Sequence, residues 1–162
     1  MRRSAGLLVY RFQRGALEVL LVHPGDPRTV RKDAGVWSIP KGEYSEGEDP
    51  FNAAKREFEE ETGVKPEGDF LPLPSLKQSK KKTVKAWALQ ADYDAAAMRG
   101  NLFSMEWPPG PGRVERYPEV DRAEWFPLPV ARTKILKGQI RLIDQLAGML
   151  AGCQTGGCRP PP

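Results

Sequence analysis

The chain has 162 residues, which is long enough for one compact domain with a hydrophobic core and too short to expect two. Its 25 lysines and arginines exceed its 21 aspartates and glutamates, and the net charge of +4 favours anionic partners without establishing nucleic-acid binding. No stretch is apolar for long enough to span a bilayer, and the apolar run near Leu7 is too short for a signal peptide, so we expect a cytoplasmic protein with no membrane association.

Two apolar, β-prone runs lie near the start of the chain. Ala5 to Tyr10 and Leu17 to His23 flank a polar linker with a glycine, a pattern that predicts a β-hairpin. His23 is the only histidine, and we interpret it as structural and not catalytic. Four aromatic residues can either stack a nucleobase or fill the core, and the core is the commoner role: Trp37, Trp87, Phe103 and Trp107.

A helix is bracketed at both ends by its sequence. Asp49 is a good N-cap and Pro50 suits the first helical turn. Gly63 suits the position just after a helix, so the pattern predicts a helix from Pro50 to Thr62.

Glu57, Glu60 and Glu61 stand at positions i, i+3 and i+4 of this helix and therefore share one face. Like charges at this spacing cost about a few tenths of a kcal/mol per pair, and a divalent cation would remove the repulsion. Carboxylates on a rigid helix suit Mg²⁺ or Mn²⁺, whose coordination is commonly completed by water and substrate phosphates. A solvated acidic face is the alternative interpretation.

The second half of the chain predicts more strands and a last helix. Strands are expected at Phe70–Leu76, Thr83–Tyr93 and Glu124–Leu128, with a basic turn at Lys80–Lys82 and a loop at Trp107–Gly112. Five apolar residues spaced by three and four predict an amphipathic helix packed on the sheet: Leu136, Ile140, Ile143, Ala147 and Leu150. We expect disorder over 152–162, where Cys153 and Cys158 are interpreted as incidental thiols.

The segment from Gly42 to Val64 resembles the Nudix box, G-x5-E-x7-R-E-U-x-E-E-x-G-U, where U is apolar. Every fixed position agrees: Gly42, Glu48, Arg56, Glu57, Phe58, Glu60, Glu61, Gly63 and Val64. The resemblance implies an α/β fold, the Nudix α/β/α sandwich with a central mixed β-sheet, over residues 1–151. It also implies a Mg²⁺- or Mn²⁺-dependent hydrolase that cleaves a pyrophosphate linkage in a nucleoside diphosphate joined to another group, X.

The resemblance also assigns roles to the residues of the box. It implies that Glu57, Glu60 and Glu61 bind the metal and take part in catalysis. Glu48 and Arg56 are expected to fix the loop and the helix. Gly42 is expected to permit a tight backbone path, and Gly63 is expected to have a structural role in the motif, like Glu48 and Arg56.

Two further segments extend the expected site. Trp37 to Gly42 resembles the W-x-x-P-K-G stretch of diadenosine polyphosphate and diphosphoinositol hydrolases, which implies that Lys41 and Gly42 bind substrate. In several Nudix enzymes the general base is a glutamate shortly before a tryptophan that opens a late strand, and Glu119 has that place. Glu119 is therefore the first candidate for the base or an extra metal ligand, followed by Asp121 and Glu61, and a solvated acidic loop is the alternative.

The substrate is less well determined by the sequence. Markers of ADP-ribose and diadenosine polyphosphate hydrolases, a proline or a tyrosine past the box, are absent from the window Ser79–Lys82. The P-K-G stretch and the excess of basic residues still favour a small, highly phosphorylated nucleotide such as a dinucleoside polyphosphate or a nucleoside triphosphate. The alternatives are a non-catalytic nucleotide- or RNA-binding module and an RNA 5′ pyrophosphohydrolase, although no arginine/aromatic motif supports nucleic-acid binding. Nudix proteins often dimerise, so the resemblance also allows a homodimer.

Overall fold

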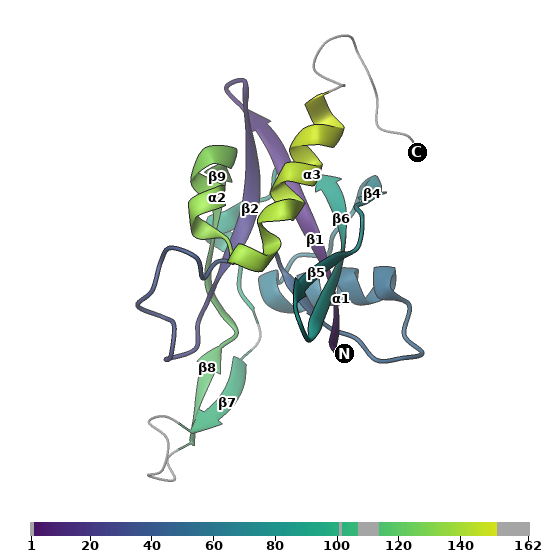
Figure 1. Ribbon diagram of the computed structural model, residues 1–162. Helices are drawn as coiled ribbons and strands as arrows, with labels where there is room; N and C mark the ends of the chain where they lie inside the picture. The colour runs from purple at the N-terminus through teal and green to yellow at the C-terminus, as the bar shows by residue number, and fades with distance from the viewer. Residues whose placement is uncertain (1, 101, 107–113, 152–162) are drawn as a thin grey trace.

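The computed structural model describes residues 2–100, 102–106 and 114–151. Its centre is a seven-stranded sheet built from β1 (Arg2–Gln13), β2 (Ala16–Pro24), β3 (Lys41–Glu43), β4 (Phe70–Pro72), β5 (Leu76–Ser79), β6 (Lys82–Gln90) and β9 (Val120–Pro127). The strand order is β4-β6-β1-β2-β9, while β3 pairs with β1 and β5 with β6 (Figure 1). Because β1 and β6 run parallel and the other pairs are antiparallel, the sheet is mixed.

Helices cover both faces of the sheet (Figure 1). On one face α1 (Pro50–Thr62) buries Ala53, Ala54 and Phe58 against side chains of β1, β2 and β6. On the other face lie α2 (Leu128–Lys134) and α3 (Ile140–Ala151), which bury a second apolar cluster. Burial of apolar side chains on both faces holds the three layers together, and the predicted α/β/α sandwich is confirmed.

The hairpin and the acidic helix agree closely with the prediction. The turn between β1 and β2 is Arg14–Gly15, whose φ angles of 53° and 79° suit a two-residue hairpin loop. The α1 helix begins at Pro50 and ends at Thr62, as expected. The Asp49 carboxylate accepts from Asn52 N at 3.0 Å, and Gly63 has a φ of 77°, so both caps form.

The later elements differ from the prediction in several places. A single strand over Phe70–Leu76 is wrong: β4 ends at Pro72 and β5 begins at Leu76, because prolines cannot donate to a strand ladder. The strand expected from Glu124 begins earlier, at Val120. The last helix begins at Ile140 after a short 3₁₀ turn, and its buried side chains are Leu142, Ile143, Leu146 and Leu150, so part of the expected apolar face is wrong.

The sequence did not predict β3, α2 or a separate hairpin of β7 (Leu102–Glu106) and β8 (Val114–Pro118), which extends away from the main sheet (Figure 1). The expected loop at Trp107–Gly112 and the tail 152–162 with its cysteines lie outside the described residues. Trp37 and Trp87 are 0% and 9% exposed, which confirms their place in the core. In the described part of the chain, no helix is long and apolar enough to cross a membrane.

Candidate active site

The acidic helix is docked on the short strand β3 by two close relationships. The Glu57 carboxylate lies against the α-carbon of Gly42, where an added Cβ would overlap it. The Lys41 backbone N–H donates to Glu61 Oε1 at 3.2 Å. The tight backbone path expected at Gly42 therefore has a specific cause, which is the carboxylate packed on it.

Arg56 gathers three glutamates around one guanidinium group. Its Nε and Nη2 donate to the two carboxylate oxygens of Glu48, at 3.1 and 3.3 Å. Its Nη1 donates to Glu57 Oε1 at 2.8 Å and to Glu60 Oε1 at 3.2 Å. Arg56 thus links the loop before the helix to two of the three box carboxylates, and its planar fork suits this multiple contact.

Glu61 is the most buried carboxylate of the site. It is 9% exposed, and its Oε2 is buried with no hydrogen-bond partner among the described residues. Burial raises the pKa of Glu61 to about 8, the Lys41 N–H and ammonium oppose that shift, and the charges of Glu57 and Glu119 add to it. A buried, unpaired carboxylate oxygen is costly unless a proton or a cation neutralises it.

The neighbouring carboxyls are shifted in the same direction. Burial, followed by the charge of Glu60, raises the pKa of Glu57 despite the opposing effect of Arg56. Burial and Glu60 also raise the pKa of Glu119. Mutual repulsion of this kind is relieved by a cation placed among the carboxylates.

The side chains as arranged do not form a complete metal site. No three carboxylate, imidazole or thiol groups converge on one point in the portion of the chain described here, since Arg56 holds Glu57 and Glu60. The chemistry of the donors nevertheless fits a divalent cation, because Glu61 Oε2 is unpartnered in the described structure and the neighbouring carboxyls repel one another.

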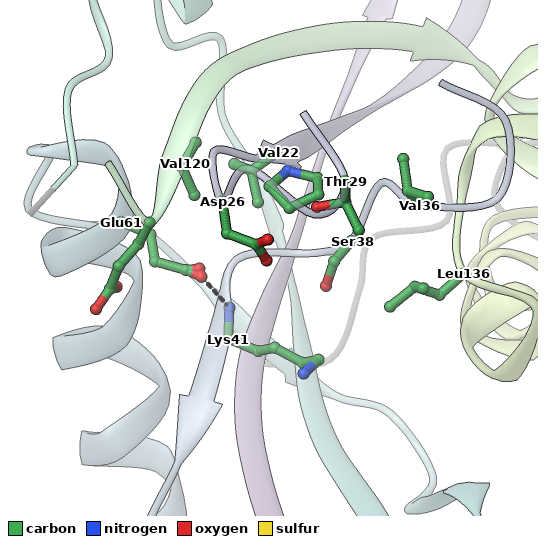
Figure 2. Close-up of a pocket in the computed structure, with 11 residues that line it drawn as sticks. Val22, Asp26, Thr29, Val36, Ser38, Lys41, Glu61, Val120 and Leu136 are labelled. Carbon is green, nitrogen blue, oxygen red and sulfur yellow. Dashed lines mark hydrogen bonds between the residues drawn. The ribbon is translucent and has the colours of Figure 1, made fainter. Parts of the chain in front are cut away.

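A cavity of about 280 Å³ lies beside Glu61 (Figure 2). Three of the predicted site residues line it together, namely Lys41, Glu61 and Glu119. Burial, together with the charge of Lys82, lowers the pKa of the Lys41 ammonium. The remaining lining residues are Val22, Pro24, Asp26, Thr29, Val36, Ser38, Val120 and Leu136.

Asp26, Thr29 and Ser38 are polar cavity residues that the sequence interpretation missed. Asp26 lies in a Pro-Gly-Asp-Pro segment, which indicates a turn and carries no sign of a binding role. Glu119 belongs to the same cavity because its backbone carbonyl accepts from Gly25 N at 3.1 Å, which joins the loop after β2 to the segment before β9.

His23 joins β9 to the loop after β2. The buried imidazole contacts Asp121 Oδ1 through Nδ1 at 2.8 Å and the Lys32 carbonyl through Nε2 at 2.6 Å. Its ring also packs edge-on against Trp37, with centroids 4.9 Å apart. These contacts agree with a structural role for His23, and they tie β2 and β9 to the loop that lines the cavity.

Comparisons with known proteins agree on one protein family. A family model described as a NUDIX domain matches residues 1–146. Nudix hydrolase 7 of Arabidopsis thaliana is 33% identical over 114 residues, which are 65% of this chain and 38% of that protein. RNA pyrophosphohydrolase of Rhizobium meliloti is 33% identical over 101 residues, which are 57% of this chain and 59% of that protein. The chain thus spans less than two thirds of the length of either relative.

Among solved structures, the crystal structure of a Caenorhabditis elegans Ap4A hydrolase binary complex has a TM-score of 0.64 and 25% sequence identity, covering 94% of this chain and 99% of that one. The family model spans most of the chain, and the three-layer fold and the capped acidic helix agree with it. This chain belongs to the Nudix family.

Proposed function

We propose that this protein is a Mg²⁺- or Mn²⁺-dependent Nudix hydrolase that cleaves a pyrophosphate linkage in a nucleoside diphosphate joined to a group X. The observation that carries the proposal is Glu61, whose buried Oε2 has no partner among the described residues and which shares one cavity with Lys41 and Glu119. A buried carboxylate beside a lysine and a second carboxylate is suited to metal-assisted attack of water on phosphorus.

Glu57, Glu60 and Glu61 are the residues proposed to hold the ion. When bound there, a divalent cation polarises a phosphoryl oxygen and lowers the pKa of a coordinated water. The Arg56 contacts keep Glu57 and Glu60 close together and near the helix face that carries Glu61. The three carboxylates are thus gathered on one helix face, and Glu57 and Glu60 would turn from Arg56 to coordinate the ion.

Glu119 is proposed as the general base. Its carboxylate would take the proton of the attacking water, and a raised pKa makes it a better proton acceptor at neutral pH. Lys41 is proposed to hold a substrate phosphate through its ammonium group, from the cavity wall that it shares with Glu61.

Dinucleoside polyphosphates and nucleoside triphosphates are the favoured substrates. The P-K-G stretch containing Lys41 supports them, as does the similarity to the Ap4A hydrolase structure over nearly all of both chains. The similarity to an RNA pyrophosphohydrolase supports a second candidate, removal of pyrophosphate from RNA 5′ ends. A non-catalytic nucleotide-binding module is the third candidate, and a cytoplasmic location and a homodimer stay predictions.

Phosphate release from a panel of substrates tests the proposal. The panel contains dinucleoside polyphosphates, nucleoside triphosphates, nucleotide sugars, ADP-ribose and 5′-triphosphorylated RNA, each with Mg²⁺ or Mn²⁺. We expect metal-dependent turnover that Glu60→Gln abolishes. Glu59→Gln is the matched control, because Glu59 is an exposed neighbour on the same helix outside the fixed positions of the box. Nucleotide binding without any turnover would favour the binding module instead.

A further inference from the structure

The cavity beside Glu61 has two chemically different ends (Figure 2). Glu61 and the Lys41 backbone lie at one end. Asp26 is in the middle, with its carboxylate directed into the cavity, and Thr29 and Ser38 lie beyond it. Val36 and Leu136 form the apolar far end. The Lys41 side chain extends away from Glu61 along the floor of this view (Figure 2), and the metal chemistry proposed above uses only the Glu61 end.

The Asp26 carboxylate is held in place by its neighbour Arg28. Arg28 N and Nε donate to Asp26 Oδ1 at 2.7 and 3.0 Å, and Arg28 Nη2 donates to Oδ2 at 3.2 Å. Burial alone would raise the pKa of Asp26, but these bonds and the guanidinium charge outweigh it and the pKa is lowered. The group therefore stays ionised, and each oxygen keeps acceptor capacity toward the cavity.

Thr29 offers a second polar atom at the same end. Its Oγ1 is buried and, within the described structure, has no partner with hydrogen-bond geometry, although it lies close enough to Asp26 to help lower that pKa. Ser38 is already satisfied, because its Oγ donates to the Ile39 carbonyl at 2.7 Å and accepts from Gln139 Nε2 at 3.0 Å. The groups left for a ligand are thus the Asp26 carboxylate and the Thr29 hydroxyl.

The part of the cavity around Asp26 and Thr29 disfavours a second phosphate and favours a hydrogen-bond donor without negative charge. An ionised carboxylate repels phosphate oxygens and accepts only from N–H or O–H donors, while the valine and leucine walls favour a flat apolar surface. A nucleoside carries both features. The whole cavity, including the Glu61 end, measures about 280 Å³, just below the roughly 300–1,000 Å³ of pockets for drug-sized ligands, so it has room for no more than one nucleoside of a dinucleoside polyphosphate.

We propose that Asp26 and Thr29 form the subsite for one nucleoside of the substrate, whose N–H or O–H donors they bind while its phosphates extend toward Lys41 and Glu61. The direction of the phosphates rests on the proposed function. The nucleoside contact itself does not, because it is a binding property that needs no turnover.

Two ligands that differ only by adenosine test the subsite. They are α,β-methylene-ADP and methylenediphosphonate, whose P–C–P links resist hydrolysis, titrated calorimetrically into the whole protein with Mg²⁺. Asp26→Asn is expected to weaken the binding of α,β-methylene-ADP about tenfold. Thr29→Val is expected to weaken it about threefold to tenfold, since each substitution weakens or removes one hydrogen bond to the ligand. Methylenediphosphonate should bind both variants as it binds the wild type. Thr133→Val, an exposed site on α2, is the matched control and should change neither ligand.

Three outcomes would overturn the subsite. In the first, the variants lose affinity for both ligands equally. In the second, they lose affinity for neither ligand. In the third, the wild type binds α,β-methylene-ADP no better than methylenediphosphonate. Thr29→Val keeps the shape of the side chain, so it remains informative if Asp26→Asn disturbs the loop. If the variants lose affinity for α,β-methylene-ADP alone and the protein hydrolyses no substrate, the subsite is supported and only the proposed hydrolysis is rejected.

Discussion

The carboxylate of Glu57 occupies the space in which a side chain at Gly42 would begin. Gly42 lies in strand β3 without a left-handed backbone, so alanine is compatible with the strand but not with the carboxylate. We expect Gly42→Ala to displace Glu57 and reduce turnover by about 100-fold, because small displacements of catalytic groups have effects of this size. Steady-state kinetics checks this.

Gly148→Ala is the control for that substitution. Gly148 lies within α3, and a Cβ there meets open space. Alanine should leave turnover unchanged and stabilise the fold by about 0.5–1 kcal/mol, as it does in helix interiors. Full activity of Gly42→Ala would show that the position of Glu57 is unimportant.

Arg56 contacts Glu48, Glu57 and Glu60 at once, which a lysine ammonium cannot reproduce. Arg56→Lys is therefore expected to weaken Mn²⁺ binding and to lower kcat by about tenfold or more, with little change in thermal stability. Electron paramagnetic resonance of Mn²⁺ and kinetics measure the two effects. Arg132→Lys, at a surface pair with Asp144, should change neither.

Glu119→Gln separates three roles for this residue. If Glu119 is the general base, kcat should fall by about 10²- to 10⁴-fold while Mn²⁺ affinity is retained. A parallel loss of Mn²⁺ affinity would instead make Glu119 a metal ligand. If Glu119→Gln has unchanged kinetics, like the exposed control Glu124→Gln, Glu119 has no catalytic role and belongs to a solvated acidic loop.

Glu61 makes the metal-free protein sensitive to pH. Its pKa is raised to about 8 in the folded state, so the folded protein holds a proton that the unfolded chain has lost above about pH 4.5. The free energy of unfolding should therefore fall as pH rises from about 4.5 to 8, by an amount on the order of a few kcal/mol. Other carboxylates titrate as well, so the quantity to measure is the difference between wild type and Glu61→Gln.

In EDTA, Glu61→Gln should match the wild type near pH 4.5 and become the more stable protein near pH 8, because glutamine cannot acquire the buried charge. Mg²⁺ should stabilise the wild type more than Glu61→Gln, and the difference should grow at higher pH. Denaturant unfolding at several pH values measures both trends. A difference that does not vary with pH would contradict the proposed cost of the buried carboxylate.

Features that depend on neighbours along the chain follow from the amino-acid sequence alone. The caps at Asp49 and Gly63 fix the ends of α1, and the spacing of Glu57, Glu60 and Glu61 fixes their common face, since helix geometry alone sets both. The box spacing identified the family and, through it, the three-layer fold. The strand pair that opens the chain followed from local alternation and its turn.

Contacts between segments that are distant in the sequence depend on the three-dimensional fold. The Glu57 carboxylate rests on Gly42 of β3, which pairs with β1, and the loop after β2 brings Asp26 into one cavity with Glu61. Short elements such as α2 and β3 were missed because so few residues carry little periodicity, and contacts with the sheet stabilise them instead. The pKa of Glu61 is raised because the side chain is buried, and burial is a property of the folded protein that the local sequence does not determine.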